Sequence, residues 1–282
     1  MKRLRACIIG HPVAHSRSPL IHNHWLSVHG IAGEYVREDV SPAAIEAFLK
    51  AFPQSGYIGG NVTVPHKEVA FTAAAGRDAV AEALGAVNTL WHEHGKLFGA
   101  NTDVYGFLAH LDESAPRWSE RTKTALVLGA GGSARAAIHG LRERSVGNIV
   151  VANRTHTRAE QLAAHFGKHV LPIAIGDIPS RLAEADLLLN TTTLGMRGTP
   201  PLEIDLAALK RGAIVYDFVY APLETPLLAQ ARARGHPAVD GLGMLLHQAV
   251  PAFERWFGVR PTVTPELRTL VVADLAREGF GR

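Results

Sequence analysis

The sequence of 282 residues contains one cysteine, Cys7, so no disulfide can form within the chain. A lone cysteine fits a reducing compartment, and we expect a cytoplasmic protein. No run of about 18 apolar residues occurs, so no membrane span is expected. The apolar stretch 6–9 that follows the basic start ends at Gly10. It is shorter than the roughly 7–15 apolar residues of a signal peptide, and none is expected.

The sequence also lacks a large excess of charge of either sign. The chain has 29 Lys and Arg against 26 Asp and Glu, a net charge of +3, and no block of five or more like charges. Nucleic acid is therefore not expected as a partner, and a small anionic ligand suits the balance better. Despite 15 histidines, there is no His-Glu-x-x-His motif and no cysteine cluster. We expect no metal site, and we interpret pairs such as His22/His24 and His92/His94 as surface histidines.

Alternating strand and helix patterns organise the chain. Its length predicts about two domains, and 47% hydrophobic residues suffice for their cores. Strands separated by helical stretches predict parallel βαβ units with right-handed crossovers. In the first half, strands are predicted at 6–10, 35–40 and 59–64, with a hairpin at 86–98. In the second half, strands are predicted at 125–128, 149–152, 186–190 and 213–217, with helices between them and at 243–257 and 265–277.

A glycine-rich turn follows the predicted strand 125–128. Its sequence is G-A-G-G-S-A, and a helical pattern starts at Ser133. Glycines let backbone amides approach a pyrophosphate at the positive end of a helix. The predicted dinucleotide-contacting residues are Gly129, Ala130, Gly131, Gly132 and Ser133. Because the motif is short, an ordinary strand-to-helix turn remains the alternative.

The end of the next predicted strand indicates which dinucleotide binds. An NAD site carries an acidic residue there, whereas this chain has Asn153, Arg154 and Thr155, with Arg158 one turn later. An arginine can grip a 2′-phosphate with its planar fork. The sequence therefore favours NADP(H) over NAD(H). The alternative is that both arginines belong to a solvated helix start.

Three further clusters group hydroxyl and amide residues at predicted strand ends, where open α/β sheets bind ligands. Ser16 and Ser18 precede a helix start and suit an anionic group, although Ser18 could be only an N-cap. In N-V-T-V-P-H-K, residues 61–67, Lys67 lies at a helix start, where the dipole disfavours a cation. The third cluster combines residues 85–89 with 99–103. Its Asp103 could be simply a helix-start carboxylate.

Seven motifs occur in order: H-S-x-S-P, N-V-T-x-P-x-K, G-A-V-N-T, N-T-D-x-x-G, the glycine turn, N-R-T and G-x-G-M-L-x-x-Q. Together they closely resemble the shikimate dehydrogenase family, from residue 6 to residue 257. The resemblance implies reversible, NADPH-dependent reduction of 3-dehydroshikimate to shikimate, within chorismate and aromatic amino acid biosynthesis. It also implies two α/β domains, a substrate-binding domain with a mixed sheet and a Rossmann-like NADP-binding domain, with the active site in the cleft between them.

The resemblance implies a role for each matching residue. The substrate carboxylate would be held by Ser16, Ser18 and Tyr220, and the ring hydroxyls by Thr63, Asn88, Asp103 and Gln248. Lys67 and Asp103 would be catalytic, with Lys67 giving the developing alkoxide a proton or stabilising its charge. The nicotinamide would lie near Phe218, Gly241 and Met244. Phe218 replaces a methionine that many members have, which keeps an apolar wall. No role is assigned to Asp78, where the pattern is looser.

Helical spacing places Met244 and Gln248 on one face, so that one can face nicotinamide and the other the ring acid. Thr192 is expected to line the cofactor site, with a capping hydroxyl as the alternative. Because Gln248 must return to Ser16 and Lys67, the predicted substrate domain is discontinuous, 1–104 plus 240–282, and 105–239 binds NADP. We expect a monomer or homodimer with small-molecule ligands. The alternative functions are a quinate/shikimate-type paralogue and a non-catalytic NADPH-binding sensor.

Overall fold

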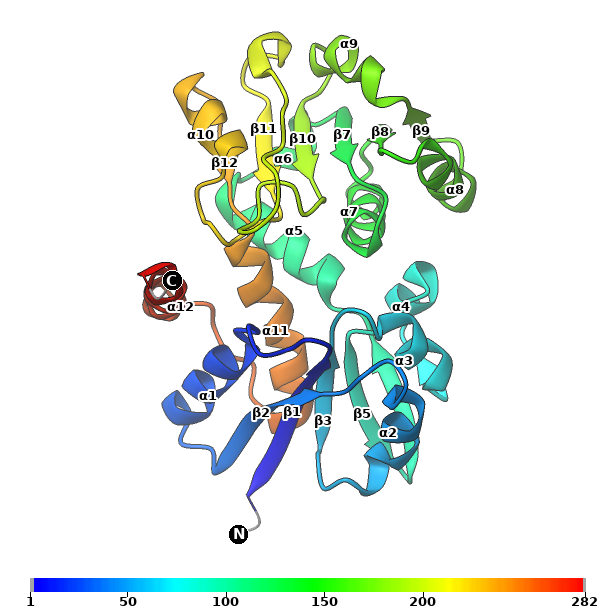
Figure 1. Cartoon of the computed structure of the whole chain (residues 1–282), viewed down its shortest axis with the longest axis vertical. Coiled ribbons are helices and arrows are strands. Elements are labelled where there is room, and N and C mark those ends of the chain that lie inside the picture. The colour runs from blue at the N-terminus through cyan, green and yellow to red at the C-terminus, as the bar shows by residue number, and fades with distance from the viewer. Residues whose placement is uncertain (1–2, 281–282) are drawn as a thin grey trace. The chain divides into compact units, whose positions relative to one another are not determined.

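The computed structural model describes residues 3–280 and contains two compact units (Figure 1). The first comprises the chain up to Asp103 together with the part from Leu246 onward, and the second runs from Val104 to Leu245. The predicted domain ranges also include residues 1, 2, 281 and 282, which lie outside the described residues.

The first unit is built on a six-stranded mixed sheet of order β2-β1-β3-β5-β6-β4. β1 pairs in parallel with β2 and β3, whereas β5 is antiparallel to β3 and to β6, with which it forms the predicted hairpin. The mixed sheet is thus confirmed, although the two-residue strand β4 was not predicted. The strands are β1 (Leu4–Gly10), β2 (Gly33–Asp39), β3 (Gly59–Val62), β4 (Gly76–Arg77), β5 (Thr89–Glu93) and β6 (Lys96–Ala100).

Alternation along β1 divides the first unit into two cores. Cys7 and Ile9 belong to the core that also contains residues of α2, α3 and α4. Ala6 and Ile8 belong to the core that contains Trp256 of α11. Burial raises the pKa of the Cys7 thiol, so the thiol stays protonated and unreactive and serves only to pack the core. The helices are α1 (Ser18–Val28), α2 (Ile45–Ala51), the 3₁₀ turn η1 (Phe52–Gln54), α3 (Lys67–Ala73), α4 (Ala79–Leu84), α11 (Leu242–Phe257), whose first residues belong to the second unit, and α12 (Pro265–Phe280).

For two residues of the first unit, the structure gives a different or additional result from the sequence analysis. His22, interpreted as a surface histidine, is fully buried, because it faces inward on α1 and stacks on Tyr35 with ring centroids 4.2 Å apart. Asp78, which had no predicted role, is the N-cap of α4 and accepts a hydrogen bond from the Ala81 amide at 2.7 Å.

The second unit is built on a six-stranded, fully parallel sheet of order β12-β11-β10-β7-β8-β9, which confirms the predicted βαβ units. The register places Leu128, Ala152 and Asn190 beside one another at the carboxyl ends of the three central strands. The strands are β7 (Thr124–Leu128), β8 (Asn148–Ala152), β9 (Val170–Ile173), β10 (Leu187–Asn190), β11 (Ile214–Asp217) and β12 (Ala238–Val239). Of these, β9 and β12 were not predicted.

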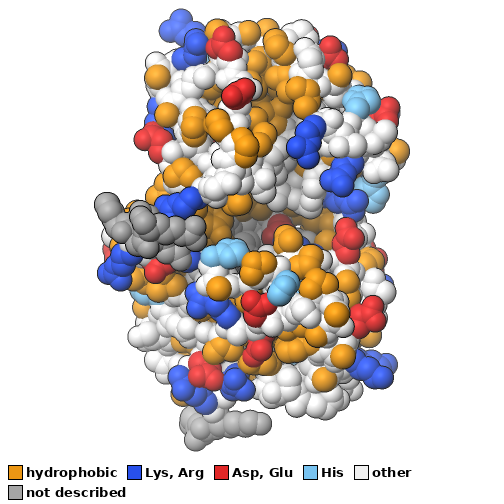
Figure 2. Space-filling view, in the orientation of Figure 1, with side chains coloured by type: hydrophobic (Ala, Val, Ile, Leu, Met, Phe, Trp, Pro, Cys, Tyr) orange, Lys and Arg blue, Asp and Glu red, His pale blue; other side chains and the backbone are white. Residues whose placement is uncertain are grey.

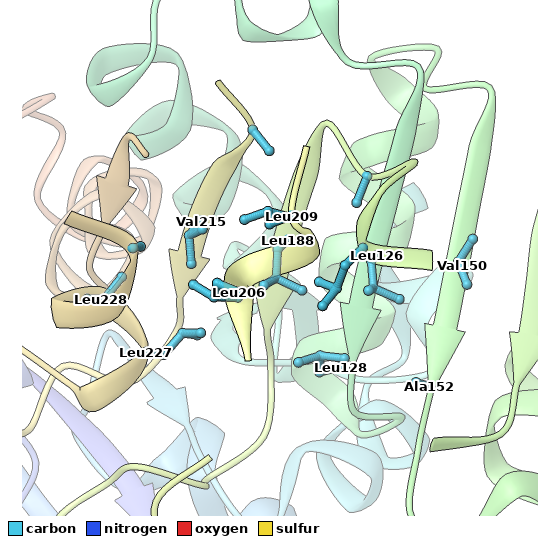
Figure 3. Packing of buried hydrophobic residues seen from close by; sticks show 14 of the residues in the cluster. Leu126, Leu128, Val150, Ala152, Leu188, Leu206, Leu209, Val215, Leu227 and Leu228 are labelled. Atoms are coloured by element: carbon cyan, nitrogen blue, oxygen red, sulfur yellow. The ribbon is translucent and has the colours of Figure 1, made fainter. Parts of the chain in front are cut away.

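One face of this sheet carries an aliphatic core (Figure 3). Leu126, Leu188 and Val215 project from three neighbouring strands toward Leu206 and Leu228, which come from the covering segments. On the opposite face, Tyr216 packs against Phe107 of α5 with ring centroids 5.6 Å apart. The helices are α5 (Asp103–Ser114), α6 (Trp118–Arg121), α7 (Gly132–Glu143), α8 (His156–Phe166), η2 (Ile175–Asp177), α9 (Ile178–Leu182), η3 (Leu206–Ala208) and α10 (Pro226–Ala233).

One face of the molecule shows mixed charge. On the face in view in Figure 2, basic and acidic side chains are interspersed over both units. Within residues 3–280, no helix combines the length and the hydropathy needed to cross a membrane. The same part of the chain contains no group of three His, Cys, Asp or Glu side chains arranged to hold a metal ion.

Candidate active site

A lysine–aspartate pair lies at the centre of the polar site in the first unit. Lys67 is the first residue of α3 and Asp103 the first of α5, and Lys67 Nζ donates to Asp103 Oδ2 at 2.5 Å. The side chains are 28% and 16% exposed, so the pair is sheltered but still reachable. Asp103 was also interpreted as a possible helix-start carboxylate, and it does occupy that position. Its oxygens nevertheless accept from side chains, which is more than a helix start requires.

Asn88 connects this pair to the rest of the site. Its Nδ2 donates to Asp103 Oδ1 at 2.8 Å, and its Oδ1 accepts from the Thr102 amide at 2.9 Å. Thr102 Oγ1 lies 3.5 Å from Gln248 Oε1 on α11, so the C-terminal part of the chain does return to this site. Four predicted residues, Lys67, Asn88, Asp103 and Gln248, are therefore gathered in one unit. Thr102 itself was not among the predicted site residues.

A buried hydrogen-bond chain extends from Asn88 toward the serines, and sequence analysis missed it. Asn61 donates from Nδ2 to the Asn88 carbonyl at 3.1 Å and accepts at Oδ1 from the Tyr35 hydroxyl at 2.7 Å. Tyr35 is fully buried, which raises its pKa well above the usual value, while a hydrogen bond with the Ser18 side chain acts in the opposite direction. The N-V-T motif had singled out Asn61, but no sequence signal pointed to Tyr35.

The two serines lie in the turn before α1. The Ser18 amide donates to Ser16 Oγ at 3.3 Å, so the two residues are in direct contact. Ser18 is not the N-cap, because α1 begins at Ser18 and Arg17 occupies the cap position. Thr63 follows β3 and lies against Gly10, where a Cβ would come within 2.5 Å of the Thr63 methyl group. Both segments thus follow the carboxyl ends of β1 and β3.

In the second unit, the glycine turn connects β7 to α7. Gly129 has a φ of +110°, and a Cβ there would lie 2.7 Å from Thr191 Oγ1, so only glycine fits. Gly131 is the N-cap and has no capping side chain. Gly131 and Gly132 are exposed, and a Cβ at either would meet nothing within 4 Å, so there is open space beside the backbone at the start of α7. Ala130 and Ser133 flank them.

The end of β8 lies beside this turn, because the Gly129 amide donates to the Ala152 carbonyl at 2.8 Å. Asn153 then turns the chain by donating to the Thr155 carbonyl at 2.9 Å. Arg154 and Arg158 are both exposed. The next acidic residue along the chain is Glu160 on α8, whose carboxylate lies 3.5 Å from the His156 ring.

Thr192 follows β10, and its hydroxyl is engaged in a local turn. Its Oγ1 donates to Asn190 Oδ1 at 2.7 Å and accepts from the Leu194 amide at 3.1 Å. This is the capping geometry that was the alternative for Thr192, and its cofactor role stays a prediction. Asn190 in turn donates to Asp217, which is fully buried. Burial raises the pKa of the Asp217 carboxyl.

The predicted nicotinamide neighbours lie next to each other. Phe218 follows β11, and its ring is 5.1 Å from that of Tyr216. A Cβ at Gly241 would come within 2.1 Å of the Phe218 carbonyl oxygen, so this close approach requires glycine. Met244 is half-buried on the first turn of α11, and Tyr220 is half-buried just beyond Phe218. All four residues belong to the second unit, whereas the two serines belong to the first.

A mixed-sheet unit with a sheltered lysine–aspartate pair, and a parallel-sheet unit with an open glycine turn, together define a two-domain α/β oxidoreductase. Three family models match the chain: the shikimate dehydrogenase substrate binding domain over residues 8–90, shikimate/quinate 5-dehydrogenase over 113–195, and the shikimate 5′-dehydrogenase C-terminal domain over 241–264. The chain belongs to the shikimate dehydrogenase family.

Similar proteins cover nearly the whole chain. Shikimate dehydrogenase (NADP(+)) of Azorhizobium caulinodans is 59% identical over 275 residues, 98% of each chain. The protein of the same name from Methylobacterium radiotolerans is also 59% identical, over 96% of this chain and 98% of its own. Among solved structures, Thermus thermophilus shikimate 5-dehydrogenase in complex with NADP(H) and shikimate has a TM-score of 0.85 and 35% identity, over 98% of this chain and all of its own. Corynebacterium glutamicum quinate dehydrogenase in complex with NAD has a TM-score of 0.89 and 32% identity, over 96% and 99%.

Proposed function

We propose that this protein is an NADP-dependent shikimate dehydrogenase that reversibly reduces 3-dehydroshikimate to shikimate. The observation that carries the proposal is the 2.5 Å pair of Lys67 and Asp103, held by Asn88 within the motifs that define the family resemblance. The proposal is also supported by the 59% identity to shikimate dehydrogenases (NADP(+)) over nearly the full length.

The residues of the second unit fit NADP(H). The exposed backbone at Gly131 and Gly132, at the start of the twelve-residue helix α7, suits a pyrophosphate. The exposed guanidinium groups of Arg154 and Arg158 suit a 2′-phosphate, because an arginine fork pairs with phosphate oxygens. Phe218, Gly241 and Met244 would line the nicotinamide. When bound, NADPH supplies the hydride that turns the ketone into an alcohol.

Proton transfer falls to the first unit. As the ketone carbon is reduced, its oxygen gains negative charge and needs a proton. Lys67 Nζ is the donor, or stabilises the charge as an ammonium. Asp103 orients Nζ through Oδ2, and Asn88 holds the other carboxylate oxygen in place. In the oxidation direction, the same lysine receives the proton of the alcohol.

The remaining polar residues would hold the ring acid. Ser16 and Ser18 offer hydroxyl donors to the carboxylate, together with Tyr220. Thr63, Asn88, Asp103 and Gln248 offer donors and acceptors to the ring hydroxyls. A substrate with one carboxylate and several hydroxyls matches this set better than an apolar or cationic one.

The test is a steady-state comparison of shikimate and quinate, each with NADP⁺ and with NAD⁺. We expect the highest kcat/KM for shikimate with NADP⁺. The similarity to a quinate dehydrogenase solved with NAD makes quinate with NAD⁺ the specific rival, and a preference for that combination would contradict the proposal. NADPH binding without turnover of either acid would identify a non-catalytic sensor.

We further propose that the enzyme works in the cytoplasm, as a monomer or a homodimer, on these small-molecule ligands. Light scattering coupled to size-exclusion chromatography, at the protein concentration of the assay, distinguishes the two assemblies. A larger assembly would contradict this part of the proposal.

A further inference from the structure

A buried arginine separates the two serines of the proposed carboxylate site. Arg17 is 4% exposed, although its guanidinium carries a permanent charge. Its Nε lies 2.6 Å from Oδ2 of Asp274, which forms the ion pair that such a buried charge requires. Asp274 belongs to α12, near the far end of the sequence, and its side chain is 41% exposed.

The same guanidinium holds the backbone of residues 15–18, which we name the serine loop. Arg17 Nη1 donates to the His15 carbonyl at 2.5 Å. From the other side, Arg37 Nη2 donates to the Ser16 carbonyl at 2.6 Å. Two consecutive carbonyl groups are therefore fixed by arginine donors. Because the Ser18 amide also donates to Ser16 Oγ, the position of the first serine hydroxyl depends on this backbone.

α12 is well placed to act as an anchor for the loop. It packs against α1, and the Trp25 indole of α1 donates to the Thr262 carbonyl just before α12 at 3.2 Å. The Asp274–Arg17 ion pair adds a charged contact at the end of α1 where the serines lie. At 2.6 Å between Arg17 Nε and Asp274 Oδ2, the ion pair adds a Coulomb attraction that packing alone does not supply.

We propose that Asp274 is a positioning residue for substrate binding: acting through Arg17, it holds the serine loop in the geometry that binds the substrate carboxylate. This inference rests on the proposed function, in which Ser16 and Ser18 bind that carboxylate. Without Asp274, the Arg17 guanidinium loses this charged partner, and its hold on the His15 carbonyl loosens. The serine hydroxyls then lose their fixed position, while Lys67 and Asp103 keep theirs.

The direction in which KM for shikimate changes distinguishes a positioning role of Asp274 from a simple effect of its charge. Removing an acidic group near a site for an anion should, by Coulomb's law alone, strengthen binding and lower KM for shikimate. Positioning predicts the opposite. For Asp274→Asn we expect KM for shikimate to rise roughly three- to tenfold, with kcat and KM for NADP⁺ within about twofold of wild type. Asp274→Glu, which keeps the carboxylate, should restore much of the affinity.

The control is Glu266→Gln, which removes the same charge from the exposed first turn of α12 and should leave all three constants unchanged. Arg17→Met completes a double-mutant cycle. If Asp274 acts through Arg17, then Asp274→Asn adds nothing to KM in the Arg17→Met background. Arg17→Lys retains the charge but loses the fork, and should raise KM in the same direction even if Arg17→Met folds poorly.

Three results would overturn the inference. The first is an unchanged or lowered KM for shikimate in Asp274→Asn, and the second is a rise in KM from Asp274→Asn that is as large in the Arg17→Met background as in the wild type. The third is an Asp274→Asn variant in which only kcat falls. Thermal melting of each variant separates loss of fold from loss of binding. A wild-type protein that turns over no shikimate would instead refute the proposed function, so the two failures are distinguishable.

Discussion

Asp103→Asn isolates the role of the carboxylate that orients Lys67. If asparagine keeps the oxygen that accepts from Asn88 at 2.8 Å, it places an amide NH₂, which is a donor, where Oδ2 meets Lys67 Nζ at 2.5 Å. A charge-assisted hydrogen bond of this kind contributes about 1.5–3 kcal/mol. Because the two side chains are 28% and 16% exposed, solvent screening puts the loss of folding stability below this range, at about 1 kcal/mol.

The catalytic loss should be larger than the loss of stability. A misplaced proton donor costs on the order of 10²- to 10³-fold in kcat, equivalent to about 3–4 kcal/mol of transition-state stabilisation. The assay is shikimate oxidation followed by NADPH absorbance, with urea unfolding measured in parallel. Glu113→Gln, the same change in charge at the exposed far end of α5, is the matched control. A kcat for Asp103→Asn within about threefold of wild type would refute the role assigned to Asp103.

Two further predictions concern the cofactor and pH. Arg154→Ala should raise the Kd of NADPH at least about tenfold while leaving that of NADH nearly unchanged, measured by fluorescence titration; equal losses for both would contradict the 2′-phosphate role. Burial lowers the pKa of His22 to about 3, so the folded protein keeps it neutral while the unfolded chain protonates it below its usual pKa of 6.5. Because only the unfolded chain takes up this proton, the free energy of unfolding is unaffected by His22 titration above pH 6.5. It falls as the pH drops from 6.5 toward 3, and the loss at pH 5 is about 2 kcal/mol. His22→Phe, which keeps an aromatic ring on Tyr35, should reduce the difference between urea unfolding free energies at pH 7 and pH 5; an unchanged difference would exclude His22 as its source.

The fold follows closely from local sequence patterns where the elements are long. Apolar runs such as 125–128 and 149–152, separated by helical stretches, predicted the parallel sheet of the second unit. The strands that were missed are short edge strands, β4 and β12, with two residues each, and β9 with four. Such strands form because a neighbouring strand offers hydrogen-bonding groups, and their own residues carry little periodic signal.

The candidate site was predictable where chemistry is concentrated in motifs. Three motifs predicted Lys67, Asn88 and Asp103 as site residues: N-V-T-x-P-x-K, G-A-V-N-T and N-T-D. In the structure these three residues are connected by hydrogen bonds. The support behind these residues was not predictable. Tyr35 enters the site through a hydrogen bond to Asn61, and Arg17 is held by Asp274 on a helix at the other end of the chain. Such contacts depend on tertiary packing and have no local spacing to reveal them.

Substitution of Lys67 by methionine tests the central claim most directly. Methionine keeps an unbranched side chain and removes the only group of Lys67 that can carry the proton, and Lys96→Met, at an exposed position on β6, is the matched control. The decisive measurement is kcat for shikimate oxidation with NADP⁺. The account predicts a fall of on the order of 10³-fold with KM for shikimate changed by less than about threefold, and wild-type activity in the control. A Lys67→Met enzyme that retains wild-type kcat would contradict it.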